Sequence, residues 1–136
     1  MRLAILFLIL IFLADMLGFY ISAYRIPIYD TVLHFFGGFF VAMFFYIYLK
    51  DSIRARCLKN ALIIVGVTVF IGAIWEFAEY SATSLIGDYL YDKYRIICCI
   101  GDMNDTLNDL AMDIIGAITF ALVFLNPLRR FNSKKI

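Results

Sequence analysis

Acidic side chains at helical spacing are the feature of this chain best suited to chemistry. Asp30 and His34, the only histidine, are four residues apart, and Glu76 and Glu79 are three apart. Each pair would therefore lie on one face of a helix. These residues fall within or beside long apolar segments, where an ionised side chain costs about 2.5–3.5 kcal/mol or more to bury in a membrane. The pattern predicts a polar site between helices.

The segment 102–113 carries the strongest signal, because its aspartates recur at helical spacing. At about 100° per residue they stay within roughly one quadrant of a helix. They are Asp102, Asp105, Asp109 and Asp113. Helix capping would account for Asp105 but not for Asp113, which would lie ~12 Å deeper. Because lipid exposure of such a stripe is unfavourable, we expect it to face the bundle interior. Asp15, midway along the first apolar segment, either joins this interior or is a structural hydrogen-bond partner.

Electrostatics limits what such a cluster can contain. Packed carboxylates cannot all ionise, since like charges at short range disfavour one another. Either some stay protonated, as in proton relays, or a metal cation holds them in their charged form. An oxygen-rich site with one imidazole suits Mg²⁺, Mn²⁺ or Ca²⁺, and Fe²⁺ less well. We predict a divalent metal and no organic cofactor. The predicted metal ligands are Asp30, His34, Glu76, Glu79, Asp105, Asp109 and Asp113.

The elements that position these residues are four membrane-spanning helices. The 136-residue chain is 64% hydrophobic, with a mean hydropathy of +0.89, which is outside the soluble range. A spanning helix needs ~20 mostly apolar residues. The segments that qualify are about 3–21, 31–49, 60–84 and 105–125. We expect an all-α, four-helix transmembrane bundle forming a single domain, 1–136. Asp30 and Asp105 are predicted helix N-caps, and Ile86 to Gly101 a long connection that could cover a pocket.

The basic residues set the predicted orientation. Of the twelve Lys and Arg residues, only Arg25, Lys93 and Arg95 fall in the first and third connections, whereas ten of the eleven acids lie toward that side. By the positive-inside rule, both termini are then cytoplasmic and the site opens to the outer face of the cell (inner) membrane. Asp15 interrupts the signal-peptide-like start, so we expect an uncleaved span. The few basic residues argue against nucleic-acid binding. Cys98 and Cys99 support no functional prediction.

These motifs together resemble a known family. The order is Asp-x-x-x-His-Phe-x-Gly-Gly from Asp30, Trp-Glu-x-x-Glu-Tyr from Trp75, and Asp-Thr-x-x-Asp-Leu-x-x-Asp-x-x-Gly-Ala from Asp105. This resembles the YjdF-like family of small inner-membrane proteins and is similar, more distantly, to VanZ-like proteins. The latter are associated with resistance to a glycopeptide antibiotic, and typically carry asparagine where this chain has Asp113. The matching positions are Asp30, His34, Gly38, Glu76, Glu79, Asp105, Asp109, Asp113 and Gly116; we assign the glycines to helix packing.

Three functions remain open at this stage. The first is a metal-dependent hydrolase or transferase acting on a lipid-linked or envelope substrate. Its metal would be held by Asp105, Asp109 and Glu76, with His34 as ligand or general base. The second is a proton- or cation-coupled transporter or sensor, for which transport would require homo-oligomerisation or an inward opening. The third is a membrane scaffold. The sequence identifies neither the substrate nor the metal.

Overall fold

The computed structural model is an all-helical bundle, and it describes residues 1–50, 57–96 and 103–125. Its helices are α1 (Arg2–Ile21), α2 (Pro27–Leu49), α3 (Cys57–Tyr94) and α4 (Met103–Phe124), with a short 3₁₀ helix η1 (Ala23–Arg25) between the first two. All four α-helices are long and apolar enough to cross a membrane. The predicted four-helix membrane bundle is thus confirmed.

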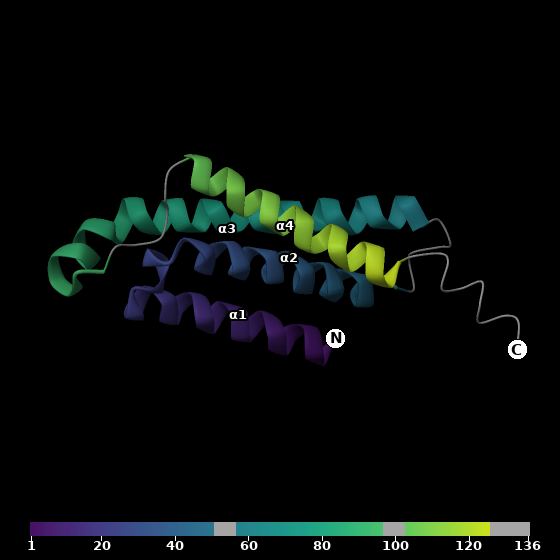
Figure 1. Ribbon diagram of the computed structural model, residues 1–136, viewed down its shortest axis with the longest axis horizontal. Helices are drawn as coiled ribbons and strands as arrows, with labels where there is room; N and C mark the ends of the chain where they lie inside the picture. The colour runs from purple at the N-terminus through teal and green to yellow at the C-terminus, as the bar shows by residue number, and fades with distance from the viewer. Residues whose placement is uncertain (51–56, 97–102, 126–136) are drawn as a thin grey trace, which may run out of the picture.

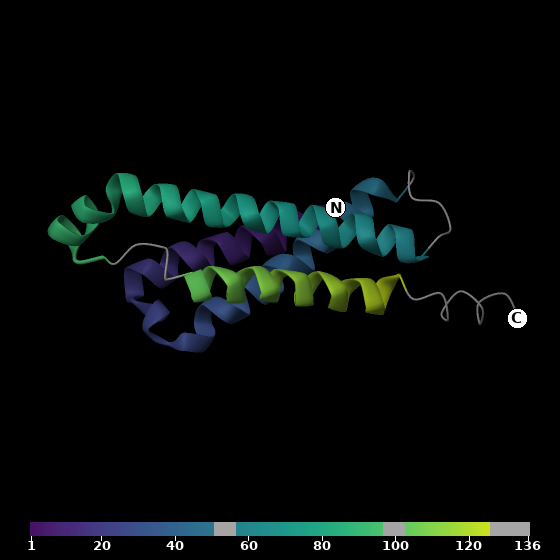
Figure 2. The same ribbon diagram turned by 90° about the horizontal axis from the view of Figure 1, so that it is seen from above.

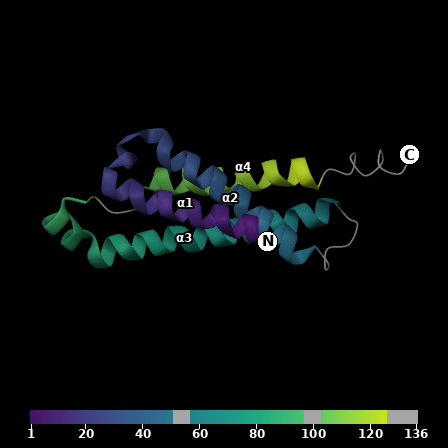
Figure 3. The ribbon, with the colours of Figure 1, turned by 90° about the horizontal axis from the view of Figure 1, so that it is seen from below.

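Helix α2 is the central element of the bundle. It packs against α1, α3 and α4, and its contact with α4 is the most extensive (Figure 1). Helix α1 lies against α2, on the side away from α4 (Figure 3). Within the described chain, the Cα atoms of α1 and α3 do not come within 8 Å of one another. Contact between these two helices is therefore made by side chains and not by closely packed backbones.

The contact between α2 and α4 is close because glycines, which have no side chain, lie at the interface. A Cβ atom on Gly116 would collide with the backbone oxygen of Phe35, and one on Gly38 would collide with the backbone of Asp113. Small residues allow membrane helices to approach in this way. The prediction that these glycines serve packing is confirmed. Further toward the C-terminal ends of α2 and α4 lies an apolar core made of Ala42, Ile64, Ala117 and Phe120.

The two helix starts differ from the predicted ones. Helix α2 begins at Pro27, with Ile26 as its N-cap, so Asp30 lies in the first turn and its predicted N-cap role is wrong. Proline is favoured at this position because the first helical N–H groups have no partner within the helix. Asp105 likewise lies inside the first turn of α4, which begins at Met103, and is not its N-cap.

Helix α3 is longer than a membrane requires. Its 38 residues span about 57 Å at 1.5 Å per residue, against ~30 Å for the hydrocarbon core. It extends beyond the other helices and bends near its end (Figure 2). The predictions that this helix ends near Ser84 and that a connection begins at Ile86 are therefore wrong, because the chain is helical as far as Tyr94. The segment between Ser84 and Tyr94 contains no proline that would stop the helix. The helix ends where Arg95 adopts a left-handed conformation (φ 57°) and its N–H bonds the carbonyl of Tyr91.

Candidate functional site

The candidate site is centred on the imidazole of His34, which is 7% exposed. Its Nε2 lies 3.7 Å from Oδ1 of Asp30, one turn earlier on α2, and 3.8 Å from Oε1 of Glu76 on α3. The helical spacing predicted for Asp30 and His34 therefore brings them together. Glu76 reaches the same nitrogen because α2 packs directly against α3.

The other ring nitrogen of His34 faces α4. Its Nδ1 lies 3.6 Å from Oδ2 of Asp113, which is 5% exposed. Asp113 can lie this close because two glycines make room for it: Gly38 on α2 adjoins its backbone, and a Cβ atom on Gly72 of α3 would collide with its carboxylate. A carboxylate on the second nitrogen of an imidazole fixes the orientation and tautomer of the ring.

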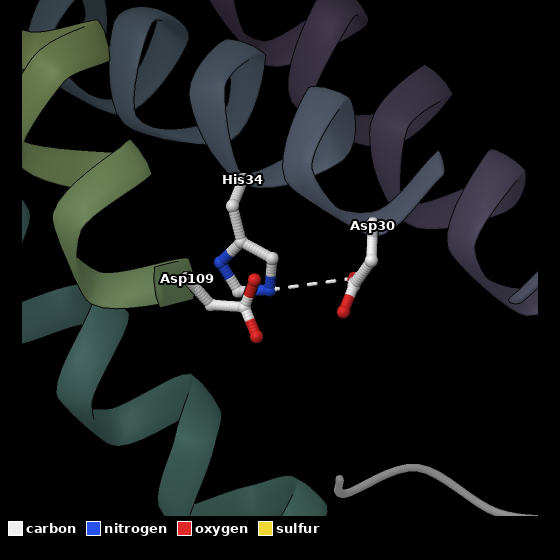
Figure 4. A group of neighbouring side chains, drawn as sticks. All are labelled: Asp30, His34 and Asp109. Atoms are coloured by element: carbon white, nitrogen blue, oxygen red, sulfur yellow. Dashed lines mark ion pairs between the residues drawn. The ribbon is translucent and has the colours of Figure 1, made fainter. Parts of the chain in front are cut away.

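Two overlapping groups of side chains place their potential ligand atoms within 4.8 Å of one another. One contains Asp30, His34 and Asp109; the other contains His34, Glu76 and Glu79. Figure 4 shows the first, with the carboxylate of Asp109 extending from α4 toward the imidazole ring of His34. The two groups share His34 and contain residues from three helices. Acidic side chains from these helices therefore meet at the imidazole of His34.

Two carboxylate oxygens at this site are buried and accept no hydrogen bond from the described residues. They are Oε1 of Glu76 and Oδ1 of Asp109, on residues only 7% and 3% exposed. Leaving a buried acceptor unpaired costs about 1–3 kcal/mol, and more if it is charged. Native proteins therefore rarely tolerate such atoms without a ligand, an ion or water. A ligand, an ion or ordered water would satisfy these two oxygens.

The separations fit a cation better than direct hydrogen bonds. Charge-assisted N–H···O bonds are about 2.7–2.9 Å long, shorter than the distances of 3.7 and 3.8 Å from Nε2 to the oxygens of Asp30 and Glu76. Two ligand atoms bound to one cation at about 2.1–2.4 Å lie about 3–4 Å apart when they subtend 90–120°. The atoms around Nε2 have this spacing, and a nitrogen with several carboxylate oxygens is a donor set that Mn²⁺ and Fe²⁺ accept.

Asp15 belongs to a separate hydrogen-bonded group at the end of α1. The hydroxyl of Tyr24 donates to its Oδ1, and the hydroxyl of Tyr29 donates to the backbone oxygen of Ala14 (2.6 Å). Burial, and then the hydrogen bond to Asp15, raise the pKa of Tyr24 above its ordinary value, so this phenol stays protonated and remains a donor. The interpretation of Asp15 as a structural hydrogen-bond partner is therefore confirmed for Oδ1. Its Oδ2 is buried without a hydrogen-bond partner in the described chain.

Only part of the predicted aspartate stripe on α4 lies at the site. Asp109 and Asp113 are buried at the site, whereas Asp105 is exposed and lies in neither group. Asp102 lies outside the described residues. Glu79 is half-buried and belongs to the group with Glu76, as its spacing predicted.

Some residues that shape the site were not identified from the sequence. Gly72 lies in a long apolar run that also contains Gly66, and its only signal was the absence of a side chain one helical turn before Glu76. Tyr24 carried no motif, although a buried mid-span acid such as Asp15 requires a donor from somewhere. Thr68 is 1% exposed on α3 and donates to the backbone oxygen of Ile64 (2.9 Å), as hydroxyls in membrane helices commonly do.

Comparison with known proteins places the chain in a family. Residues 1–130 match the model of the predicted membrane protein family DUF2238. The chain belongs to this family. It is a multi-pass membrane protein, and the resemblance to the YjdF-like family agrees with this assignment. It is also 30% identical over 125 residues to an "Uncharacterized protein" of Thermotoga maritima, a match that covers 89% of this chain and 61% of that protein. No solved structure matches the chain.

Proposed function

We propose that this membrane protein binds a divalent cation at His34 and uses it for chemistry on a lipid-linked or envelope substrate. The observation that carries the proposal is the convergence on His34 of carboxylates from three helices, with Asp30 and Glu76 lying 3.7 and 3.8 Å from its Nε2. Two of those carboxylates, Glu76 and Asp109, have buried oxygens without hydrogen-bond partners. A cation would supply the positive charge that both oxygens lack.

The ligands are assigned by their position around the ring. Nε2 of His34, Asp30, Glu76 and Asp109 would hold the cation, with Glu79 completing the set from one turn further along α3. Asp113, on the opposite ring nitrogen, would orient His34 and strengthen it as a ligand. A bound cation of this kind lowers the pKa of water or clamps a phosphate oxygen.

Access from one side supports a binding or catalytic site over a transport path. Beyond Asp113, the described part of α4 contributes the buried apolar residues Ala117 and Phe120, which pack with Ala42 and Ile64. This core closes the bundle below the site. With the orientation predicted from Lys and Arg, the site opens to the outer face of the inner membrane. An envelope substrate is consistent with that side, and with the more distant likeness to VanZ-like proteins, which remains part of this proposal.

Metal content tests the proposal. The detergent-purified protein is equilibrated with Mn²⁺, separated from free ions and subjected to elemental analysis. We expect about one equivalent in the wild type, and its loss in Asp109→Asn and His34→Ala. Asp92→Asn is the matched control, because Asp92 is an exposed acid at the far end of α3. Helicity and elution volume of each variant are compared with those of the wild type.

Two results would overturn the proposal. One is a wild-type protein without bound metal at saturating Mn²⁺. The other is equal metal content in all four proteins, which would place any bound ion elsewhere. If metal binds, the chemistry is followed by mass spectrometry of a bacterial lipid extract incubated with the protein. Any product should require the metal and disappear in Asp109→Asn.

A further inference from the structure

A cavity of about 290 Å³ adjoins the candidate site at His34. Of the site residues, His34 and Asp113 line it, whereas Asp30, Glu76, Glu79 and Asp109 are not among its described walls. It is lined by all four helices, with α4 contributing Asp113. The cavity therefore shares only His34 with the proposed cation ligands.

The walls of the cavity are almost entirely hydrocarbon. Leu8 and Ile11 contribute from α1, Val41 from α2, and Ile71 and Trp75 from α3. Gly37, Gly38 and Gly72 also line it and present backbone only. An apolar cavity of about 150 Å³ takes one benzene ring, so this one has room for roughly a dozen carbon atoms.

The cavity is partly open, and two of the helices that line it, α1 and α3, have no close backbone contact. The backbones of these helices are more than 8 Å apart throughout the described chain, and they meet through the edge-to-face ring contact of Phe12 and Trp75, whose centroids are 6.1 Å apart. Phe12 is 48% exposed and Ile71 is 36% exposed on the same side. In a bilayer, the molecules in contact with such an opening are lipid chains.

Asp15, one of the residues that line the cavity, specifies the ligand further. Oδ2 of Asp15 is buried and has no hydrogen-bond partner among the described residues, while Oδ1 is occupied by the hydroxyl of Tyr24. A ligand consisting only of hydrocarbon would leave this oxygen unpaired. A hydroxyl at the end of the hydrocarbon chain would donate to it.

We propose that the cavity between α1 and α3 binds the hydrocarbon chain of a membrane lipid whose hydroxyl donates to Oδ2 of Asp15. This lipid would present its polar end beside His34. That such lipids are the substrate class of the cation site rests on the proposed function. The binding of the lipid in the cavity does not rest on that function, because none of the cavity's contacts requires a metal.

Fluorescence quenching of Trp75 tests the proposal directly. Trp75 is the only tryptophan in the chain and forms part of the cavity wall, so a brominated chain in the cavity quenches it on contact. The protein in non-brominated detergent is titrated with a brominated long-chain alcohol and, separately, with its methyl ether, which lacks the donor. Both titrations contain EDTA, so that a failure of the metal proposal does not affect them.

The expected result is saturable quenching near one equivalent, with the alcohol binding about tenfold more tightly than the ether because of the added hydrogen bond. Asp15→Asn should abolish this preference, since its amide can still accept from Tyr24 but presents a donor to the ligand. Val41→Phe, which fills the cavity, should weaken both ligands. Val32→Phe is the matched control, because Val32 is 42% exposed on the same helix.

Quenching that rises linearly with ligand and is unchanged by Val41→Phe would overturn the proposal, because it would report contact at the outer surface. Saturable binding without preference for the alcohol would overturn the assignment of Asp15. Metal content measured on the same preparations reports separately on the cation site, so the two failures are distinguishable.

Discussion

Replacing Gly38 with alanine should separate α2 from α4 and disturb the site. A Cβ atom there would lie 2.6 Å from the Cα atom of Asp113 and 2.8 Å from its carbonyl carbon. Carbon atoms in ordinary contact are about 3.5–4.0 Å apart, so the two backbones must separate by about 1 Å. Because the obstacle is backbone, no change of rotamer can relieve it.

Gly66 provides the matched control, because a Cβ atom on it meets nothing within 4 Å. Both alanines gain about 0.5–1 kcal/mol of helix stability over glycine. Overpacking at Gly38 costs about 1–3 kcal/mol, so Gly38→Ala should be less stable than Gly66→Ala by that amount. Gly66→Ala itself should be slightly more stable than the wild type.

The assay is equilibrium unfolding in mixed micelles with increasing SDS, followed by helicity, together with Mn²⁺ affinity. Since Asp113 adjoins both Gly38 and His34, Gly38→Ala should also weaken Mn²⁺ binding, whereas Gly66→Ala should leave it unchanged. Equal stability of the two variants would refute the close packing of α2 on α4 described above.

Three further changes test other parts of the account. Tyr24→Phe removes the donor to a buried carboxylate and should lower the free energy of unfolding by about 1–3 kcal/mol, whereas Tyr20→Phe, at an 80% exposed position, should not; similar losses in both would refute the structural role of this bond. Phe120→Ala, at a 1% exposed position, should lower the free energy of unfolding in SDS by about 3 kcal/mol. This is the low end of the range for phenylalanine, because the unfolded side chain of a membrane protein enters lipid or detergent and not water. Phe77→Ala, 73% exposed, is its control, and equal effects would contradict the assigned core. Asp113→Asn should weaken Mn²⁺ binding about 10–100-fold without abolishing it, as measured by titration; unchanged affinity would exclude its orienting role.

The sequence predicted the residues of the site better than the ends of the helices. The i, i+4 spacing of Asp30 and His34 was sufficient to bring them together, because both lie on one helix and the spacing alone defines the face. The same reasoning placed Asp109 and Asp113 in the interior. The spacing did not show that Asp105 is exposed while Asp109 and Asp113 are buried. Exposure at the end of a membrane span depends on where the neighbouring helices end.

Features that depend on contacts between helices could not be predicted from one sequence. Nothing in the spacing shows that Asp113 adjoins Gly72, because that contact depends on how α3 packs against α4. The approach of Tyr24 to Asp15 depends on the turn at Ser22, which adopts a left-handed conformation and returns the chain toward α1. The continuation of α3 to Tyr94 was missed because hydropathy reports where a helix leaves the membrane, not where it stops.

The most direct test of the central claim is pulsed electron paramagnetic resonance of Mn²⁺ bound to the protein, purified with a tag that contains no histidine. Because His34 is the only histidine in the chain, a coupling of the imidazole nitrogen to Mn²⁺ can come only from that residue. The account predicts this coupling in the wild type and its loss in His34→Gln. Bound Mn²⁺ without nitrogen coupling in the wild type, or no bound Mn²⁺ at all, would contradict it.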